Sequence, residues 1–299
     1  MTPTAPPDEG VISWNMNTTC NYRCSYCTQR FKDDRGRWAR DVPRFIDAFV
    51  ALPGAWEVKL SGGEPFIHPQ FLDVVRALAA RGFRVGVVTN FSAPRNELDA
   101  FLDAAGERLS VLSASLHLEY VREEDPSGRH GTVAHFIERL RHVAGRIGPS
   151  SSVCATCVAT AANLPRLPAL RARFEDAGIP FKVQPDKQDG RVVAYGQEQV
   201  RELVRLGGHN RTGMVAPSFQ GRPCWAGARY FIVDDQGNAY RCYPARRRRT
   251  EALGNLLDGT FHPHAGPRPC LYDYCNCTVP IARGMMPTEG APDAFIAAD

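Results

Sequence analysis

The alternation of short apolar runs with segments of helical periodicity constrains the fold of this chain more than any other feature. Six apolar runs have the length of buried parallel strands, and each precedes a segment with apolar residues at helical spacing. Such units predict a parallel sheet with right-handed crossovers, and six are fewer than the eight of a closed barrel. The sequence therefore predicts an α/β fold, a partial (β/α)6 TIM-like barrel, over residues 11–210. The expected strands are Val11–Met16, Trp56–Leu60, Arg84–Val88, Leu109–Leu116, Ser151–Val158 and Ile179–Gln184, and the expected helices are Pro43–Leu52, Gln70–Arg81, Arg95–Ala105, Val133–Arg146, Leu164–Ala177 and Gln197–Leu206.

The pattern changes in the C-terminal third of the chain. Residues 207–223 have the composition of a linker. Tyr230–Val233 and Asn238–Cys242 flank the turn residues Asp234–Gly237, which predicts a β-hairpin. The last 60 residues are rich in Cys, Pro, Gly and Arg, so a bound metal more than an apolar core is expected to hold them together. We expect a small Cys-rich hairpin domain over residues 220–285, with tails at 1–10 and 286–299.

Ten cysteines in 299 residues are an unusual number. The N-terminal residues lack the features of a secretory signal, so metal or redox chemistry in the cytoplasm is favoured over disulfides. No run of about 18 apolar residues predicts a membrane span. The net charge of +4 is too balanced for a dedicated nucleic-acid binder, so we expect neither a membrane nor a nucleic acid as partner. Of the 36 basic residues, 32 are Arg and 4 are Lys, which we interpret as a genomic coding bias.

Three cysteines after the first expected strand form the most specific motif. Cys20, Cys24 and Cys27 have the spacing C-x3-C-x2-C, and only about 0.01 such triplets are expected by chance at this Cys content. Three thiolates on one loop can hold three irons of a [4Fe–4S] cube and leave the fourth iron open to another ligand. The loop follows the carboxyl end of a strand, where barrel folds place their chemistry.

A glycine-rich motif, SGGEP, follows the second expected strand at Ser61–Pro65. Gly62 and Gly63 allow the backbone to approach a ligand closely, and exposed backbone carbonyls together with the Glu64 carboxylate suit an ammonium group. Together with the cysteine triplet, and with Tyr26 directly before the third cysteine, this motif resembles the radical S-adenosylmethionine (SAM) superfamily. The resemblance implies that the glycine-rich motif binds the amino group of SAM.

The same resemblance implies a reaction and further cofactor contacts. The cluster would cleave SAM to methionine and a 5′-deoxyadenosyl radical, which abstracts hydrogen from a C–H bond. Polar residues at strand ends would touch the methionyl and ribose parts of SAM, although strand-end and helix-cap chemistry is the alternative for each. The residues concerned are Asn90, Ser115 and Asn163, and Tyr26 is a further cofactor-binding candidate.

A second group of cysteines surrounds the expected hairpin. Cys224 and Cys242 have the spacing C-x12-G-x4-C around Gly237, which resembles the start of a twitch or SPASM domain. A full SPASM pattern does not continue from there, so the resemblance implies the shorter twitch form with one auxiliary [4Fe–4S] cluster. A structural zinc site is the alternative. The candidate ligands, of which four are needed, are Cys224, Cys242, Cys270, Cys275 and Cys277.

Four thiols and two polar residues are candidates for catalysis. Cys154 and Cys157 lie three apart on an expected strand, so one of them should point into the barrel. Each is either a small buried hydrophobe or a thiol that returns a hydrogen atom to a substrate radical, a role for which the surplus thiol of Cys275 or Cys277 competes. His117 and Glu119 follow the fourth strand. They either bind a polar substrate or transfer a proton, or they are ordinary polar surface residues.

The resemblance implies a radical SAM enzyme that acts on a polar natural product, a sugar or aminocyclitol or a peptide, with an electron donor such as flavodoxin or ferredoxin. Epimerisation and dehydrogenation are the expected outcomes. The surplus of cysteines favours epimerisation, and the short N-terminal segment before the barrel favours a small polar substrate. Three alternatives stay open: a maturase of ribosomally made peptides, an RNA-modifying enzyme suggested by Arg246–Arg249, and a non-catalytic zinc-binding protein.

Overall fold

The computed structural model describes residues 7–29, 38–124, 131–188, 191–206, 219–272, 275 and 279–286. Its largest element is a nine-stranded sheet with the order β14-β13-β12-β1-β2-β3-β4-β7-β8. From β1 to β8 each strand runs parallel to its neighbour, which confirms the predicted α/β fold, a partial (β/α)6 TIM-like barrel. The six strands are β1 (Glu9–Asn17), β2 (Ala55–Gly62), β3 (Arg84–Thr89), β4 (Leu109–Ser115), β7 (Ser152–Ala159) and β8 (Phe181–Pro185).

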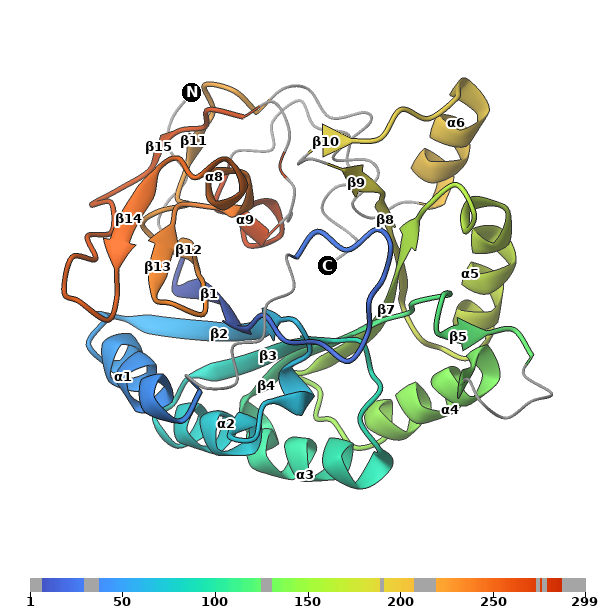
Figure 1. The fold of residues 1–299 in the computed structure, drawn as a ribbon, viewed down its shortest axis with the longest axis horizontal. Coiled ribbons are helices and arrows are strands. Elements are labelled where there is room, and N and C mark those ends of the chain that lie inside the picture. Colours follow the sequence, from blue (N-terminus) through green and yellow to red (C-terminus); the bar gives the residue numbers. More distant parts are fainter. Residues whose placement is uncertain are drawn as a thin grey trace.

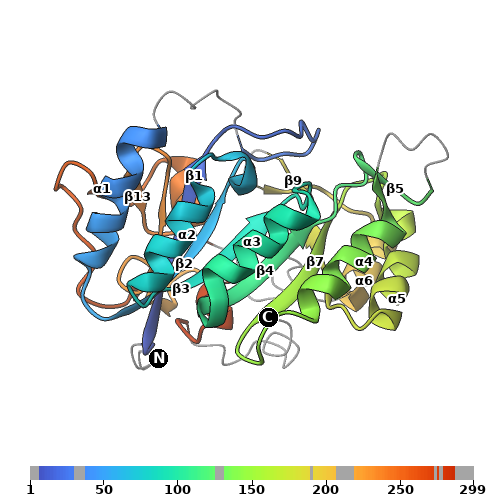
Figure 2. The ribbon, with the colours of Figure 1, turned by 90° about the horizontal axis from the view of Figure 1, so that it is seen from below.

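Helices cover the outer, convex face of this curved sheet (Figure 1), and the view from below shows α1 to α5 following one another across it (Figure 2). The boundaries of α3 and α6 agree with the sequence prediction, whereas α1 begins five residues before the expected start at Pro43. The helices are α1 (Trp38–Val50), α2 (Phe71–Ala80), α3 (Arg95–Ala105), α4 (Val133–Ala144), α5 (Leu167–Asp176) and α6 (Gln197–Leu206). Short strand pairs lie outside the main sheet: β5 (Val121–Arg122) with β6 (Gly131–Thr132), and β9 (Lys187–Gln188) with β10 (Arg191–Val192).

Alternation along β4 separates an apolar outer face from a polar inner face. In β4, Leu112 and Ala114 join the main hydrophobic core beneath the helices. Successive side chains of a strand point to opposite sides, so Ser113 and Ser115 project away from the helices. We call that side the inner face of the sheet.

One continuous sheet includes strands of both expected domains. Strand β12 (Tyr230–Val233) pairs in parallel with β1, and its antiparallel partner β13 (Asn238–Tyr240) continues the sheet to β14 (Ala252–Asn255). The predicted hairpin therefore exists, but it extends the barrel. The expected N-terminal tail is also too long, because β1 starts at Glu9.

A second hydrophobic core forms on the inner side of β1 and β12, around Val11 and Tyr230. It includes Met285 and Met286, which follow the short helix α9 (Val279–Ala282). The remaining C-terminal elements are β11 (Pro223–Cys224), which pairs with β15 (Arg268–Pro269), and α8 (Tyr243–Arg248). Among the described helices, none combines the length and the apolar character that a bilayer crossing needs.

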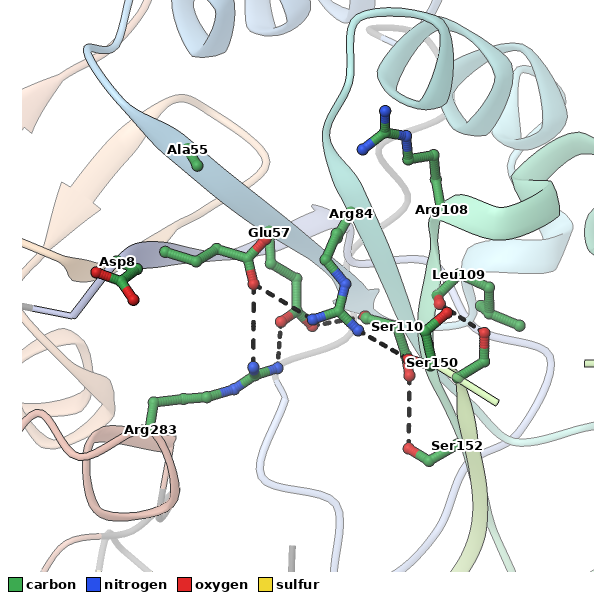
Figure 3. A network of polar contacts seen from close by, with 12 residues as sticks. Asp8, Ala55, Glu57, Arg84, Arg108, Leu109, Ser110, Ser150, Ser152 and Arg283 are labelled. Carbon is green, nitrogen blue, oxygen red and sulfur yellow. Dashed lines mark hydrogen bonds and ion pairs between the residues drawn. The ribbon is translucent and has the colours of Figure 1, made fainter. Parts of the chain in front are cut away.

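A partly buried polar network fastens this C-terminal segment to the amino ends of the barrel strands (Figure 3). Arg283 forms an ion pair with Glu57 of β2, which is fully buried and accepts a second hydrogen bond from Ser110 Oγ at 2.7 Å. Glu9 of β1 lies 4.0 Å from Arg283 and 3.4 Å from Arg84 of β3. The network lies at the end of the barrel opposite the cysteine loop.

Candidate active site

The cysteine loop starts at the carboxyl end of β1 and is held there by the glycine-rich motif. The amide of Gly63 donates to Asn17 O at 2.8 Å, and the amide of Glu64 donates to Thr19 O at 3.0 Å. Gly62 has a φ of +133°, and a Cβ there or at Gly63 would collide with the loop backbone at Asn17 and Thr19. The glycines were expected to admit a ligand, but the close approach they allow is to the cysteine loop itself.

The Glu64 side chain is turned away from solvent. It is fully buried and accepts hydrogen bonds from Thr89 Oγ1 at 2.7 Å, from the Asn90 amide at 2.6 Å and from the Phe66 amide at 3.1 Å. Burial raises the pKa of this carboxyl to about 7. Because three donors already occupy the buried Glu64 carboxylate, it does not fit the expected contact with an ammonium group.

The strand-end residues expected to touch SAM divide into two groups. Asn90 lies against the cysteine loop, donating from Nδ2 to Asn21 Oδ1 at 2.7 Å and approaching Cys20 Sγ at 3.8 Å. Ser115 is half-buried on the inner face at the end of β4. Asn163 instead donates to Val158 O at 2.9 Å and closes the turn after β7, which supports the alternative, structural role for that residue.

The segment after β4 supports the cysteine loop, a role that the sequence did not indicate. His117 Nδ1 lies 2.8 Å from Tyr26 Oη and 3.3 Å from Cys24 Sγ. Glu119 accepts from the amide and hydroxyl of Ser25 at 3.0 and 2.5 Å. Burial lowers the pKa of His117 to about 4, so the imidazole is neutral at neutral pH.

An aromatic pair completes this support. The rings of Tyr22 and Tyr120 stack with centroids 3.9 Å apart, and the Arg23 amide donates to Tyr120 Oη at 2.6 Å. His117 and Glu119, expected to meet substrate or move a proton, thus make their described contacts with the cysteine loop. The only sequence signal for this role was that the segment directly follows a strand at the carboxyl edge.

Comparison with known proteins identifies this arrangement. Residues 14–159 match the model of the Radical SAM superfamily. The chain carries a radical SAM domain. That domain contains the cysteine loop, the glycine-rich motif and the segment after β4, and it implies a [4Fe–4S] cluster and SAM as cofactors.

Relatives of the radical SAM domain differ in what their names describe. The chain is 26% identical over 206 residues to the tungsten-containing aldehyde ferredoxin oxidoreductase cofactor-modifying protein of Pyrococcus furiosus, covering 67% of this chain and 56% of that protein. It is 38% identical over 109 residues to the GTP 3′,8-cyclase of Synechococcus elongatus, covering 34% and 32%. Streptococcus suis SuiB bound to precursor peptide SuiA has a similar fold, with TM-score 0.56, 15% identity, and coverage of 86% of this chain and 65% of that one. The chain thus spans about half or less of the lengths of the two curated relatives.

The thiols of the radical SAM domain have the right chemistry for the implied cluster. Cys20 and Cys24 are half-buried and Cys27 is exposed on one short loop. Burial, followed by the charge of Cys27, raises the pKa of Cys24 to about 12, so cluster binding must displace thiol protons. Within the described ranges, no three His, Cys, Asp or Glu side chains are gathered closely enough to hold a metal ion. These three thiols suit a [4Fe–4S] cluster, and they would take up their ligand positions when the cluster binds.

The two cysteines of β7 point to opposite sides of the sheet, as predicted. Cys157 belongs to the main hydrophobic core, where burial raises its thiol pKa to about 12. Cys154 lies outside that core, in register with Ser113, whose side chain is on the inner face. Cys157 therefore does not fit the expected role of a thiol that meets substrate, and the candidate that faces inward is Cys154.

Four cysteines of the C-terminal region lie in or against the second hydrophobic core. Cys224 and Cys242 are buried in the second hydrophobic core, and Cys270 and Cys275 pack against it. Cys277, the fifth candidate ligand, lies outside the described residues. The four described cysteines thus belong to one region of the structure, although within the described residues no three of them lie close enough together to hold a metal ion.

Arg241 organises this group of cysteines and was missed by the sequence analysis. Its buried guanidinium donates to Ala226 O at 3.0 Å, Pro269 O at 2.9 Å and Arg268 O at 2.6 Å, and pairs with Glu251 at 2.7 Å. These carbonyls lie within two residues of Cys224 and Cys270 along the chain, and Arg241 itself precedes Cys242. A single side chain therefore links three cysteine-bearing segments.

The run of four arginines is divided between half-buried and exposed positions. Arg246 is half-buried and its Nη1 lies 3.4 Å from Gln29 Oε1 beside the cysteine loop. Arg248 lies over the ring of Tyr272, with 5.1 Å from Cζ to the centroid, and Arg249 ends α8 with a positive φ of 53°. Arg246 therefore has a structural contact beside the cysteine loop, while Arg248 and Arg249 are exposed.

Proposed function

We propose that this chain is a radical SAM enzyme that abstracts hydrogen from a C–H bond of a small polar natural-product substrate. The observation that carries the proposal is the clamped cysteine loop at the carboxyl edge of the barrel, directly above a polar inner face. The cluster and SAM, when bound, supply the one-electron chemistry that removes the hydrogen atom. The residues of the chain hold, orient and shield that chemistry.

Each part of the site has a distinct task in this proposal. Cys20, Cys24 and Cys27 would hold the SAM cluster. His117, neutral at neutral pH, would keep its hydrogen bond to Tyr26 without adding positive charge beside the cluster. The backbone carbonyls of the glycine-rich motif would orient the amino group of SAM.

We propose epimerisation as the outcome, with Cys154 as the hydrogen donor. The substrate loses a hydrogen atom from one face, and the Cys154 thiol returns a hydrogen atom to the other face. The resulting thiyl radical takes one electron from a donor such as flavodoxin or ferredoxin and one proton from solvent. Its inner-face position supports Cys154 over Cys157.

The C-terminal cysteines are proposed to hold one auxiliary [4Fe–4S] cluster, using Cys224, Cys242 and Cys270 with Cys275 or Cys277. Their common place in or against the second hydrophobic core supports one polynuclear site or one zinc ion. The presence of a radical SAM domain in the same chain favours iron and sulfide.

Metal analysis joined to SAM cleavage tests the proposal. Anaerobically reconstituted protein should contain about eight irons per chain and form 5′-deoxyadenosine under dithionite. Cys24→Ala should lose about four irons and all cleavage, whereas Cys242→Ala should lose about four irons from the other site. Zinc in place of iron, without 5′-deoxyadenosine, would overturn the enzyme assignment.

The type of reaction is tested by the product formed in deuterated water. Epimerisation places one deuterium on the product carbon, and Cys154→Ala should abolish this while Cys157→Ala retains it. A product two mass units lighter than the substrate would replace epimerisation with dehydrogenation.

A further inference from the structure

Arg246 is a cation that the C-terminal extension places against the cysteine loop. It lies on α8, which begins directly after Cys242, one of the expected ligands of the auxiliary site, and its amide donates to Cys242 O at 2.9 Å. The side chain reaches the barrel, where Nη1 donates to Gln29 Oε1 at 3.4 Å. Gln29 is two residues beyond Cys27, so Arg246 connects the first turn of α8 with the loop that carries the cysteine triplet.

The barrel strands anchor the same guanidinium a second time. The amide of Asn15 on β1, with its oxygen toward the guanidinium, accepts from Arg246 Nη1 and Nη2 at 2.8 and 3.0 Å. In that orientation Asn15 also donates to Ser61 Oγ on β2 at 2.7 Å. Asn15 and Ser61 are both buried, and Ser61 is the first residue of the glycine-rich motif. The guanidinium is therefore held at both motifs of the radical SAM domain.

The described part of the chain does not neutralise the charge of Arg246. The partners of its guanidinium are the amide oxygens of Asn15 and Gln29, and no acidic side chain of the described residues pairs with it. Arg241, by contrast, is paired with Glu251. Arginine stays protonated in proteins, and solvent screens a half-buried charge less than an exposed one. Arg246 therefore keeps a positive charge beside the cysteine loop.

The other charged groups near the cysteine loop have different settings. Glu119 contributes a carboxylate that accepts from the Ser25 amide at 3.0 Å. Arg23 is exposed, so solvent screens its charge, and Arg139 of α4 donates to Phe91 O at 2.9 Å beyond the end of β3. These groups belong to the barrel itself. Arg246 is a half-buried cation that the C-terminal extension supplies.

We propose that Arg246 raises the reduction potential of the SAM cluster; this inference rests on the function proposed above. Reduction transfers one electron to the cluster from a donor such as flavodoxin or ferredoxin, and the site becomes more negative by one charge. A nearby positive charge stabilises the reduced state more than the oxidised state. Arg246 ligates no iron in this proposal. It is a positioning residue that holds a charge beside the cysteine loop.

A redox titration followed by electron paramagnetic resonance tests the inference. The full-length protein is reconstituted anaerobically, and the signal of the reduced SAM cluster is identified by its change when SAM is added. Arg246→Gln should lower the ratio of reduced to oxidised SAM cluster at a fixed applied potential by roughly threefold or more. Asn15→Asp should lower this ratio as well, because a carboxylate at that position would pair with Arg246 and neutralise its charge.

Two further variants separate the charge from the hydrogen bonds. Arg246→Lys keeps the charge but loses the paired contact with Asn15, so its ratio should stay close to that of the unmodified protein. Arg248→Gln removes an exposed charge from the same helix and should leave the ratio unchanged. If Arg246→Gln loses its iron, Asn15→Asp and Arg246→Lys decide the question.

The outcomes are distinct from those that test the proposed function. An unchanged ratio in Asn15→Asp, or an equal fall in Arg246→Lys and Arg246→Gln, would overturn the role given to Arg246. Absence of any iron signal that responds to SAM in the unmodified protein would count against the proposed function instead.

Discussion

Arg241 is the residue on which the arrangement of the C-terminal cysteines most depends. Only 3% of its side chain is exposed, yet its donors are matched by three backbone carbonyls and Glu251. A planar group with five N–H donors can serve partners in several directions at once, which the ammonium of a lysine on a longer flexible stem cannot reproduce.

Replacing Arg241 should therefore destabilise the protein, because Glu251 and three backbone carbonyls would lose their hydrogen-bond donor. Arg241→Met removes the partner of Glu251, which is 16% exposed, and we expect a loss of about 3–5 kcal/mol in the free energy of unfolding. Urea unfolding of the apo protein measures this loss. The control is Arg201→Met on α6, whose exposed pair with Glu198 should contribute less than about 1 kcal/mol. Equal unfolding midpoints for the two variants would contradict the role given to Arg241.

At the scale of elements, the loop from β1 and the segment after β4 form one unit although they are about 90 residues apart. Hydrogen bonds from Ser25 to Glu119, and the stack of Tyr22 on Tyr120, join them. Neighbouring groups that orient metal ligands commonly govern how tightly the metal is held. The segment after β4 should therefore control retention of the SAM cluster.

Glu119→Ala tests this unit. Loss of both hydrogen bonds to Ser25 should accelerate iron release to a chelator, within the roughly 10- to 100-fold range seen when outer-shell partners are removed. Glu138→Ala, at an exposed position of α4, is the control. Glu119→Gln can still form hydrogen bonds with Ser25, so this variant should retain iron. If it retains iron but loses turnover, Glu119 also transfers a proton, and support of the cysteine loop is not its only role.

The elements that the sequence predicted are those whose signal is local. Helices α3 and α6 follow from their own periodicity, and the alternation of β7 correctly put Cys154 and Cys157 on opposite faces. Which cysteine faces inward depends on where the helices pack. The pairing of β12 with β1 joins residues more than 200 apart in the sequence, and no local pattern in the hairpin indicates which strand it pairs with.

For the whole molecule, this pairing means that the barrel and the C-terminal extension should unfold together. Val11 and Tyr230 on the paired strands share the second core with Met285, and Arg283 nearby is bound to Glu57 in the barrel. The Glu57–Arg283 ion pair is therefore a link between the two parts, placed at the end of the barrel away from the cysteine loop.

Arg283→Met should weaken that link. The buried Glu57 keeps its hydrogen bond from Ser110 but loses its cationic partner, so we expect a loss of about 1–3 kcal/mol, the cost of an unsatisfied buried acceptor. The double variant Glu57→Gln/Arg283→Met should recover part of this loss because the amide carries no charge. Limited proteolysis with urea unfolding distinguishes the outcomes: cleavage near the C-terminus should precede unfolding of the barrel in the single variant only. If both variants unfold in the same way as the unmodified chain, the two parts are held together by the β1–β12 pairing and the second core alone.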